Sequence, residues 1–180
     1  MNDDPGKILL TLARHAIANE LGIECATNPQ HAMLLQPGAT FVTLTENGQL
    51  RGCIGTLEAR RPLGEDVCAN ARAAAFRDPR FTPLNRDEFT RIHIEVSLLT
   101  PAQEISFTDE EDALRQLRPD IDGVILEAGQ RRATFLPQVW ESLSEPRQFM
   151  AELKHKAGLP HDYWNNGIKL SCYTVQKWKE

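Results

Sequence analysis

One cysteine of this sequence stands in a setting that could support chemistry. Cys53 lies in the segment Arg51–Thr56, which reads RGCIGT. A cysteine attacks as its thiolate, which a neighbouring guanidinium stabilises, and Arg51 is only two residues away. Glycine inside a strand is unfavourable unless the backbone bulges or another group comes close, so Gly52 and Gly55 would leave room beside the thiol. The segment predicts a reactive thiol, with a packed structural cysteine as the alternative, because free cysteine is among the most buried residue types.

Two polar residues further along the chain could assist this thiol. His93 and Glu95 alternate with apolar residues in the segment Ile92–Leu99, so both project from one face of an expected strand, about 6.6 Å apart. In a catalytic set with Cys53, the imidazole would take the thiol proton and the carboxylate would orient the imidazole. The alternative is that His93 and Glu95 form the solvated side of an amphipathic strand.

Arginine is concentrated around the same segment. The stretch from Arg51 to Arg91 contains eight arginines, no lysine and six acidic residues, so it carries a charge of +2 while the remainder of the chain carries −7. Guanidinium groups bind carboxylate or phosphate through paired hydrogen bonds, which predicts a pocket for a small anionic ligand beside Cys53. The candidate substrate-binding residues are Arg51, Gly52, Gly55, Thr56, Arg72 and Arg80. The alternative use of these arginines is in surface ion pairs with acidic neighbours.

Motifs for metals and cofactors are absent from the sequence. It contains no CxxC or HExxH pair, no Walker A segment, no GxGxxG and no GxSxG, so we expect neither a metal nor a cofactor. The formal GxxG of Gly52–Gly55 lies in an expected strand, whereas the RNA-binding KH module needs this loop between two helices.

Composition narrows the class of protein. The 180 residues carry a formal net charge of −5, with a pI near 5.6, which is the wrong sign for a general binder of nucleic acid or anionic membrane. No stretch approaches the roughly 18 apolar residues that a membrane helix needs, and no basic start leads into an apolar run. We therefore expect a cytoplasmic protein whose four cysteines are free thiols.

A hairpin is expected to carry Cys53. The segments 40–45 and 49–56 are connected through Asn47-Gly48, which favours a type I′ turn. With a two-residue turn, Cys53 would lie opposite Val42 and Arg51 opposite Leu44, so that the thiol and the guanidinium share a face.

Helices and hairpins alternate along the rest of the chain. Helical spacing of apolar residues and terminal signals predict helices over 6–21, 62–75, 109–117 (with Thr108 as N-cap) and 146–157. Strands are expected over 92–99, 123–128, 131–136 and 168–178. This order predicts an α+β fold with antiparallel or mixed sheets flanked by helices.

Several segments together resemble a known family. The segments that carry the resemblance are Leu50–Thr56, 70–75, Asp78–Phe81, Glu95–Leu99, 135–139 and 156–164. They are similar to the AmmeMemoRadiSam system protein A family, the family of the AMME-syndrome candidate protein. The resemblance implies one AMME-type domain over 1–180, built as two unequal lobes with a cleft between them, and association with radical-SAM and Memo-like proteins. It assigns no catalytic residues.

Two functions follow as hypotheses. The first is a cysteine-dependent enzyme, or enzyme subunit, that acts on a small anionic substrate alongside radical-SAM and Memo-like partners. The second is a non-catalytic adaptor that docks a protein through the face of the segment Arg51–Thr56. A concave pocket with convergent polar groups around Cys53 would favour the enzyme, and an exposed apolar patch would favour the adaptor.

Overall fold

The computed structural model describes residues 4–180, which form two compact units, each with its own hydrophobic core. Unit 1 contains the described residues up to Leu99 together with Gln176–Glu180, and unit 2 is Thr100–Val175. Both units combine helices with antiparallel strands, so the α+β prediction is confirmed.

Unit 1 is built on one five-stranded sheet, sheet 1. Its strands are β1 (Pro37–Glu46), β2 (Gln49–Gly55), β3 (Arg61–Pro62), β4 (Ile92–Leu99) and β9 (Val175–Lys179). They run in the order β2-β1-β4-β9, and β3 pairs with the start of β1 outside this path. The helical elements are α1 (Pro5–Glu20), η1 (Ala32–Leu35), α2 (Leu63–Phe76) and α3 (Arg86–Phe89).

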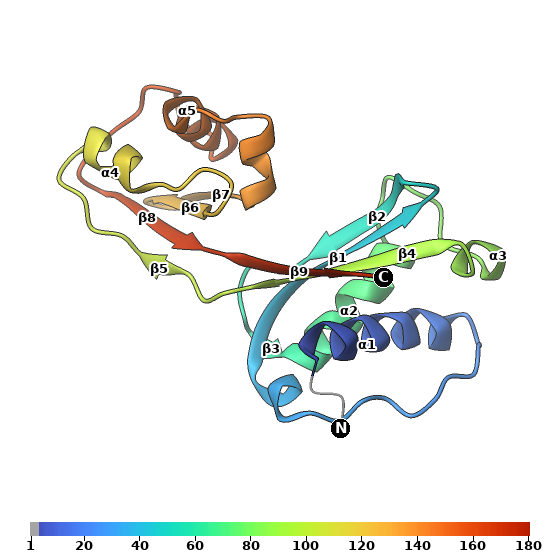
Figure 1. Ribbon diagram of the computed structural model, residues 1–180. Helices are drawn as coiled ribbons and strands as arrows, with labels where there is room; N and C mark the ends of the chain where they lie inside the picture. Colours follow the sequence, from blue (N-terminus) through green and yellow to red (C-terminus); the bar gives the residue numbers. More distant parts are fainter. Residues whose placement is uncertain (1–3) are drawn as a thin grey trace. The chain divides into compact units, whose positions relative to one another are not determined.

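Helices α1 and α2 cover the same face of sheet 1 (Figure 1). The buried stripe of α1 includes Leu9, Ala13 and Ile17, four residues apart, and this spacing brings them to one side of the helix. They pack in one core with β-strand residues such as Val42 and Leu44, both fully buried. Since strand side chains alternate between faces, the odd-numbered residues of β1 point to the other side, here called the second face of sheet 1.

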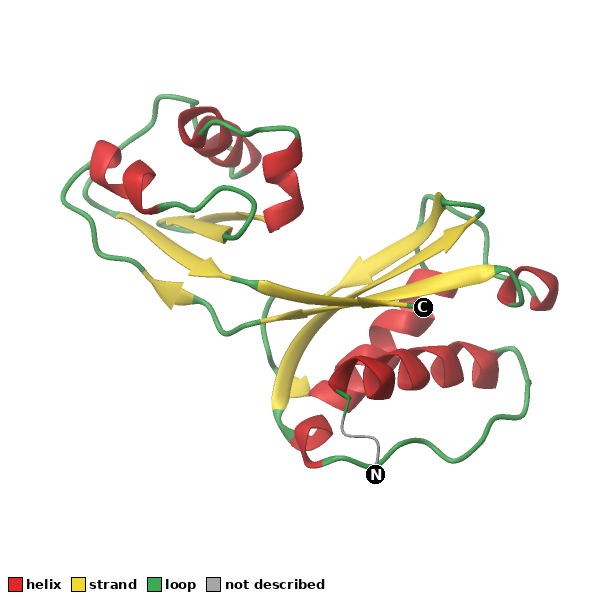
Figure 2. Ribbon diagram, viewed as in Figure 1, coloured by secondary structure: helices red, strands yellow, loops and turns green. Residues whose placement is uncertain are grey.

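Unit 2 has a smaller sheet with helices on one side (Figure 2). Its strands are β5 (Gln103–Glu104), β6 (Gly123–Ala128), β7 (Arg131–Phe135) and β8 (Ile168–Tyr173), in the order β5-β8-β6-β7. The helical elements are α4 (Glu110–Gln116), η2 (Pro137–Glu141) and α5 (Pro146–Lys156). Trp140 stacks on Phe149 with ring centroids 3.7 Å apart, and both side chains lie in the core.

Two expectations about elements are wrong. The closing segment 168–178 is not one strand, because it divides at Thr174 into β8 and β9, which belong to different sheets. The cap of α4 is Asp109 and not Thr108: the Asp109 carboxylate accepts a hydrogen bond from the backbone N–H of Asp112 at 2.8 Å.

The described chain has no helix with the length and apolar character needed to cross a bilayer. The four cysteines are free: Cys25 is exposed, and the other three are half-buried.

Candidate functional site

The hairpin that carries Cys53 forms as expected, but with a different register. Glu46 lies opposite Gln49, and the pairing then shifts between Thr45 and Leu44, so that Gly52 faces Leu44. Thr43, and not Val42, is therefore the partner of Cys53. The predicted register is wrong because β2 contains a β-bulge, which inserts one extra residue into one strand of a pair.

The bulge separates the two groups that were expected to share a face. The alternation along β2 is interrupted at Arg51 and Gly52, so Arg51 turns toward the helix side of sheet 1 while Cys53 turns to the second face. A Cβ atom at Gly52 would overlap the backbone carbonyl oxygen of Ala74 in α2. Glycine is needed here because the strand backbone lies directly against the helix.

The Cys53 thiol is half-buried on the second face and contacts one hydroxyl group. Thr43 Oγ1 donates a hydrogen bond to the sulfur at 3.2 Å. The Cys53 backbone is held as well, because its N–H donates to Asp78 Oδ2 at 2.9 Å and its carbonyl oxygen lies 3.4 Å from Arg80 Nη2. At this edge of sheet 1, the side chains of Asp78 and Arg80 therefore contact the backbone groups that a further strand would otherwise bind.

Asp78 is the centre of this edge contact. Its carboxylate is almost fully buried and accepts hydrogen bonds from Arg80 Nη2 at 2.7 Å and Arg80 Nε at 2.9 Å. The hydrogen bonds from the Arg80 guanidinium, more than offsetting burial, hold the pKa of Asp78 well below its usual range. The Arg80 side chain is about half exposed, at 54%, so part of its guanidinium faces solvent near Cys53.

Arg51 has other partners. Its guanidinium donates to Glu88 through Nε at 2.8 Å and Nη2 at 3.2 Å, and Nη2 also donates to the carbonyl oxygen of Thr82 at 2.9 Å. The pKa of Glu88 is lowered, chiefly by the hydrogen bond from Arg51. Arg51 is 8% exposed, so it ties β2 to the segment after α2 and does not face a ligand on the second face.

Thr56 also lies in an internal network. Its hydroxyl donates to Asp66 Oδ1 at 2.5 Å, and the same carboxylate accepts from Thr40, Arg61 and Asn70. Asp66 is fully buried. The network satisfies a buried charge and joins α2 to the ends of β1 and β2.

His93 and Glu95 lie on β4, with β1 between them and Cys53. Glu95 pairs with Thr43, which pairs with Cys53, so the three side chains form one row on the second face. Two strand spacings separate Cys53 from Glu95 by about 10 Å between Cα atoms. His93 is exposed and pairs with Thr45 in the next row. Among residues 4–180, neither residue is hydrogen-bonded to the thiol.

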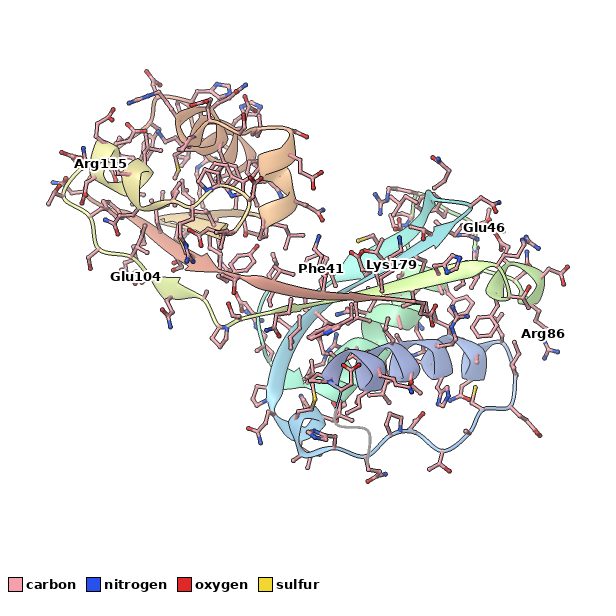
Figure 3. The ribbon with its side chains drawn as sticks, viewed as in Figure 1. Phe41, Glu46, Arg86, Glu104, Arg115 and Lys179 are labelled. Atoms are coloured by element: carbon pink, nitrogen blue, oxygen red, sulfur yellow. The ribbon has the colours of Figure 1, made fainter. Side chains whose placement is uncertain are left out.

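The remaining candidates lie elsewhere. Arg72 is on the outer side of α2, with its Nε 3.9 Å from Glu20 Oε2. A Cβ atom at Gly55 would overlap the ring of Phe41, labelled in Figure 3, so this ring lies close over the glycine. The protein's own atoms therefore occupy the space expected at Gly52 and Gly55.

Sequence reasoning missed the groups that contact the Cys53 residue. The sequence pattern places Thr43 in a strand and Asp78 in a segment that resembles the family, and it predicts no contact of either residue with Cys53. A signal was present in Asp78-Pro79-Arg80, where an acid and an arginine two residues apart follow the end of a helix.

Burial raises the pKa of the other two half-buried thiols, those of Cys68 and Cys172. Burial raises the pKa of Cys68, although Arg72 opposes the effect. Burial, followed by the charge of Asp122, raises the pKa of Cys172 to about 11.

Within the described part of the chain, no group of three or more His, Cys, Asp or Glu side chains could hold a metal ion.

Comparison with known proteins gives a consistent result. The AMMECR1 family model matches residues 10–178. A protein of Saccharolobus islandicus is 38% identical over 96% of this chain and 80% of its own length. A Sulfolobus acidocaldarius protein is 40% identical over the whole chain and 83% of its own length. The crystal structure of the uncharacterised protein PH0010 from Pyrococcus horikoshii superposes with a TM-score of 0.82 and 34% identity, covering 97% of this chain and 91% of that one.

Proposed function

This chain belongs to the AMMECR1 family, and from that premise we propose that it is a cysteine-dependent enzyme, or enzyme subunit, whose Cys53 thiol acts on a small anionic substrate. In this proposal Arg80 supplies the positive charge that attracts the substrate, in place of Arg51. The protein works beside radical-SAM and Memo-like proteins, the partners that the family resemblance implies.

One observation carries the proposal: the Cys53 thiol is half-buried on the second face, and the half-exposed Arg80 guanidinium lies 3.4 Å from the backbone carbonyl oxygen of the same residue. The thiol already accepts a hydrogen bond from Thr43 Oγ1, and the Cys53 backbone is fixed by Asp78 and Arg80. Asp78 offsets part of the Arg80 charge, so the attraction of an anionic reagent to the sulfur in this proposal comes from the solvent-exposed side of the guanidinium.

The test compares two alkylating reagents that differ in charge. Iodoacetate is anionic and iodoacetamide is neutral. With both, the thiolate electron pair forms the S–C bond while the C–I bond breaks, iodide leaves, and the thiol proton passes to the buffer. At low salt we expect the ratio of the iodoacetate rate to the iodoacetamide rate to be several-fold higher at Cys53 than at the exposed Cys25. Peptide mass spectrometry follows each cysteine separately.

Variants assign the effect to Arg80. Arg80→Gln should bring the rate ratio at Cys53 close to that at Cys25, whereas Arg80→Lys should keep most of it. Arg72→Gln, which removes a charge on the outer side of α2, is the matched control. Equal ratios at Cys53 and Cys25, or an unchanged ratio in Arg80→Gln, would overturn the proposal.

A non-catalytic adaptor is the second candidate, and a specific observation favours it. Nε and Nη2 of Arg51 and the Thr56 hydroxyl are engaged in internal hydrogen bonds, so the motif also builds a fixed surface. An adaptor would use the shape of the second face and not its thiol. With purified radical-SAM and Memo-like proteins from the same genome, Cys53→Ser would then keep complex formation in gel filtration, while Thr45→Arg on the same face would abolish it.

A further inference from the structure

Unit 1 contains a hollow that the proposed site does not use. It lies between the outer side of α2, the turn η1 and α1, with a volume of about 550 Å³, in the range of pockets for small organic ligands. The residues that matter for its chemistry are Leu12, Leu34, Leu35, Arg61, Cys68 and Arg72. Cys53 is on the second face of sheet 1, so α2 and the sheet separate the two places.

The wall formed by η1 is firmly attached to α2. The backbone N–H of Leu63, at the start of α2, donates to the carbonyl oxygen of Gln36 at 2.8 Å. Next to this bond, Pro37 pairs with Pro62 where β1 meets β3. The hollow is therefore preformed, which lowers the entropy cost of binding.

The interior of the hollow is mainly apolar and one leucine is left uncovered. Leu34 is 9% exposed, whereas its neighbour Leu35 is 75% exposed, the most of any large hydrophobic side chain in the described residues. An apolar ligand lying along these leucines would remove Leu35 from water, a favourable exchange.

Two arginine side chains line the hollow. Arg61 donates to Asp66 through Nε at 2.8 Å, and its side chain is 38% exposed, so that its terminal nitrogens have no hydrogen-bond acceptor among residues 4–180. Arg72 is 41% exposed, and its ion pair with Glu20 is long, at 3.9 Å. Glu65 also lines the hollow, so an acidic ligand must approach from the arginine side.

We infer that this hollow binds a small amphiphilic acid, with its apolar chain along Leu34 and Leu35 and its carboxylate at Arg72 and Arg61. Leucine side chains provide no directional contact, so the arginines fix the orientation of the ligand.

Cys68 provides a built-in reporter of occupancy. Its half-buried thiol lines the hollow, while the exposed Cys25 lies outside it. A bound chain must cover Cys68 and slow its alkylation without affecting Cys25. The probe is decanoate below its micelle concentration, with decanol as the uncharged analogue and N-ethylmaleimide as the alkylating reagent.

We expect saturating decanoate to slow Cys68 alkylation at least fivefold and to leave the Cys25 rate unchanged. Arg72→Gln should raise the decanoate concentration for half-protection about threefold to fivefold, the upper part of the range for a single exposed ion pair. Arg77→Gln is the matched control, because Arg77 also contacts Glu20, at 3.5 Å, but does not line the hollow.

Any one of several outcomes would overturn the inference. They are an unprotected Cys68, equal protection of Cys25 and Cys68, and the same half-protection concentration in Arg72→Gln and Arg77→Gln. Protection by decanol as strong as that by decanoate would show that the hollow does not recognise the acid.

Ala69→Trp, which fills the hollow from α2, gives a second check and should abolish protection while the protein stays folded. Because Cys53 is not involved in any of these readouts, their failure leaves the proposed function untouched.

Discussion

A single buried carboxylate organises the edge of β2. Asp78 binds the Cys53 N–H and the Arg80 guanidinium together, so its negative charge is compensated in the folded protein only. Its pKa is lowered by folding, so the folded state binds fewer protons than the unfolded chain. The stabilisation is therefore complete above the unfolded pKa of about 3.9 and is lost as the pH falls through the lower folded value.

Asp78→Asn should consequently destabilise the protein in a pH-dependent manner. We expect a loss of about 1–3 kcal/mol at pH 7, because the amide cannot compensate Arg80 and makes weaker hydrogen bonds. The difference between wild type and variant should be constant from pH 7 to pH 5 and should shrink below pH 4. Urea unfolding at several pH values measures it. A difference that stays the same down to pH 3 would show that the charge of Asp78 is not responsible.

At the scale of elements, the contact between β2 and α2 depends on a glycine, Gly52, which has no side chain to keep the two backbones apart. Gly52 lies against the Ala74 carbonyl oxygen, and this oxygen belongs to a helix backbone that cannot move independently of its turn. Any side chain at position 52 must push the bulge away from α2.

Gly52→Ala should therefore destabilise unit 1 by about 2–3 kcal/mol, as overpacking against backbone does. Gly48→Ala is the comparison: Gly48 has open space around it and φ of +77°, so only backbone strain of about 1 kcal/mol is expected there. Native-state hydrogen exchange of the amides in β1 and β4 gives both values for unit 1. Equal losses in the two variants would contradict the packing explanation.

The limits of sequence reasoning appear at the same scale. The Asn47-Gly48 turn and the alternation in Ile92–Leu99 are local signals, and the hairpin and β4 form where they predict. At Arg51 the local signal is Gly52, which is compatible with a bulge but does not fix the strand register, and the backbone of α2 that lies against Gly52 is distant in the sequence. The division of the closing segment at Thr174 could not be predicted from local sequence either. Both sides of Thr174 have strand-like residues, and only tertiary pairing assigns them to different sheets.

The candidate site was predictable only in part. The RGCIGT segment located Cys53, yet the groups that define its surroundings come from distant positions. Asp78 is 25 residues away from Cys53 along the chain, and Glu88 is 37 residues away from Arg51. A single sequence does not show which distant polar residues pair.

At the scale of the molecule, unit 2 is inserted between two parts of unit 1. Its ends are adjacent: the Thr100 N–H donates to the Thr174 carbonyl oxygen at 2.9 Å, and the Thr174 N–H donates to Thr100 Oγ1 at 2.8 Å. Since each unit has its own core, the insertion should be separable from its host.

We expect the segment 100–175 to fold when produced alone. Unit 1 should also fold when Leu99 is joined to Gln176 through two glycines, since the gap is only a strand spacing wide. Dispersed amide resonances in NMR spectra, together with slow hydrogen exchange in β6 and β8 or in β1 and β4, would confirm each. Spectra typical of an unfolded chain for either product would contradict the division into two independent cores.

The contact between Gly6 and Trp178 joins the first helix to the last strand, so it can form only late in synthesis. A Cβ atom at Gly6 would overlap the Trp178 indole, so α1 is shaped to fit a residue of β9. Trp178 is translated after all of unit 2. The sequence of unit 2 is therefore synthesised completely before the last residues of unit 1. The contact of α1 with β9 forms only after Trp178 has been added to the chain. Unit 1, which carries Cys53, therefore gains this last contact of α1 only after all of unit 2 has been synthesised, although its own core residues, from Ile8 to Val96, all precede unit 2 in the chain.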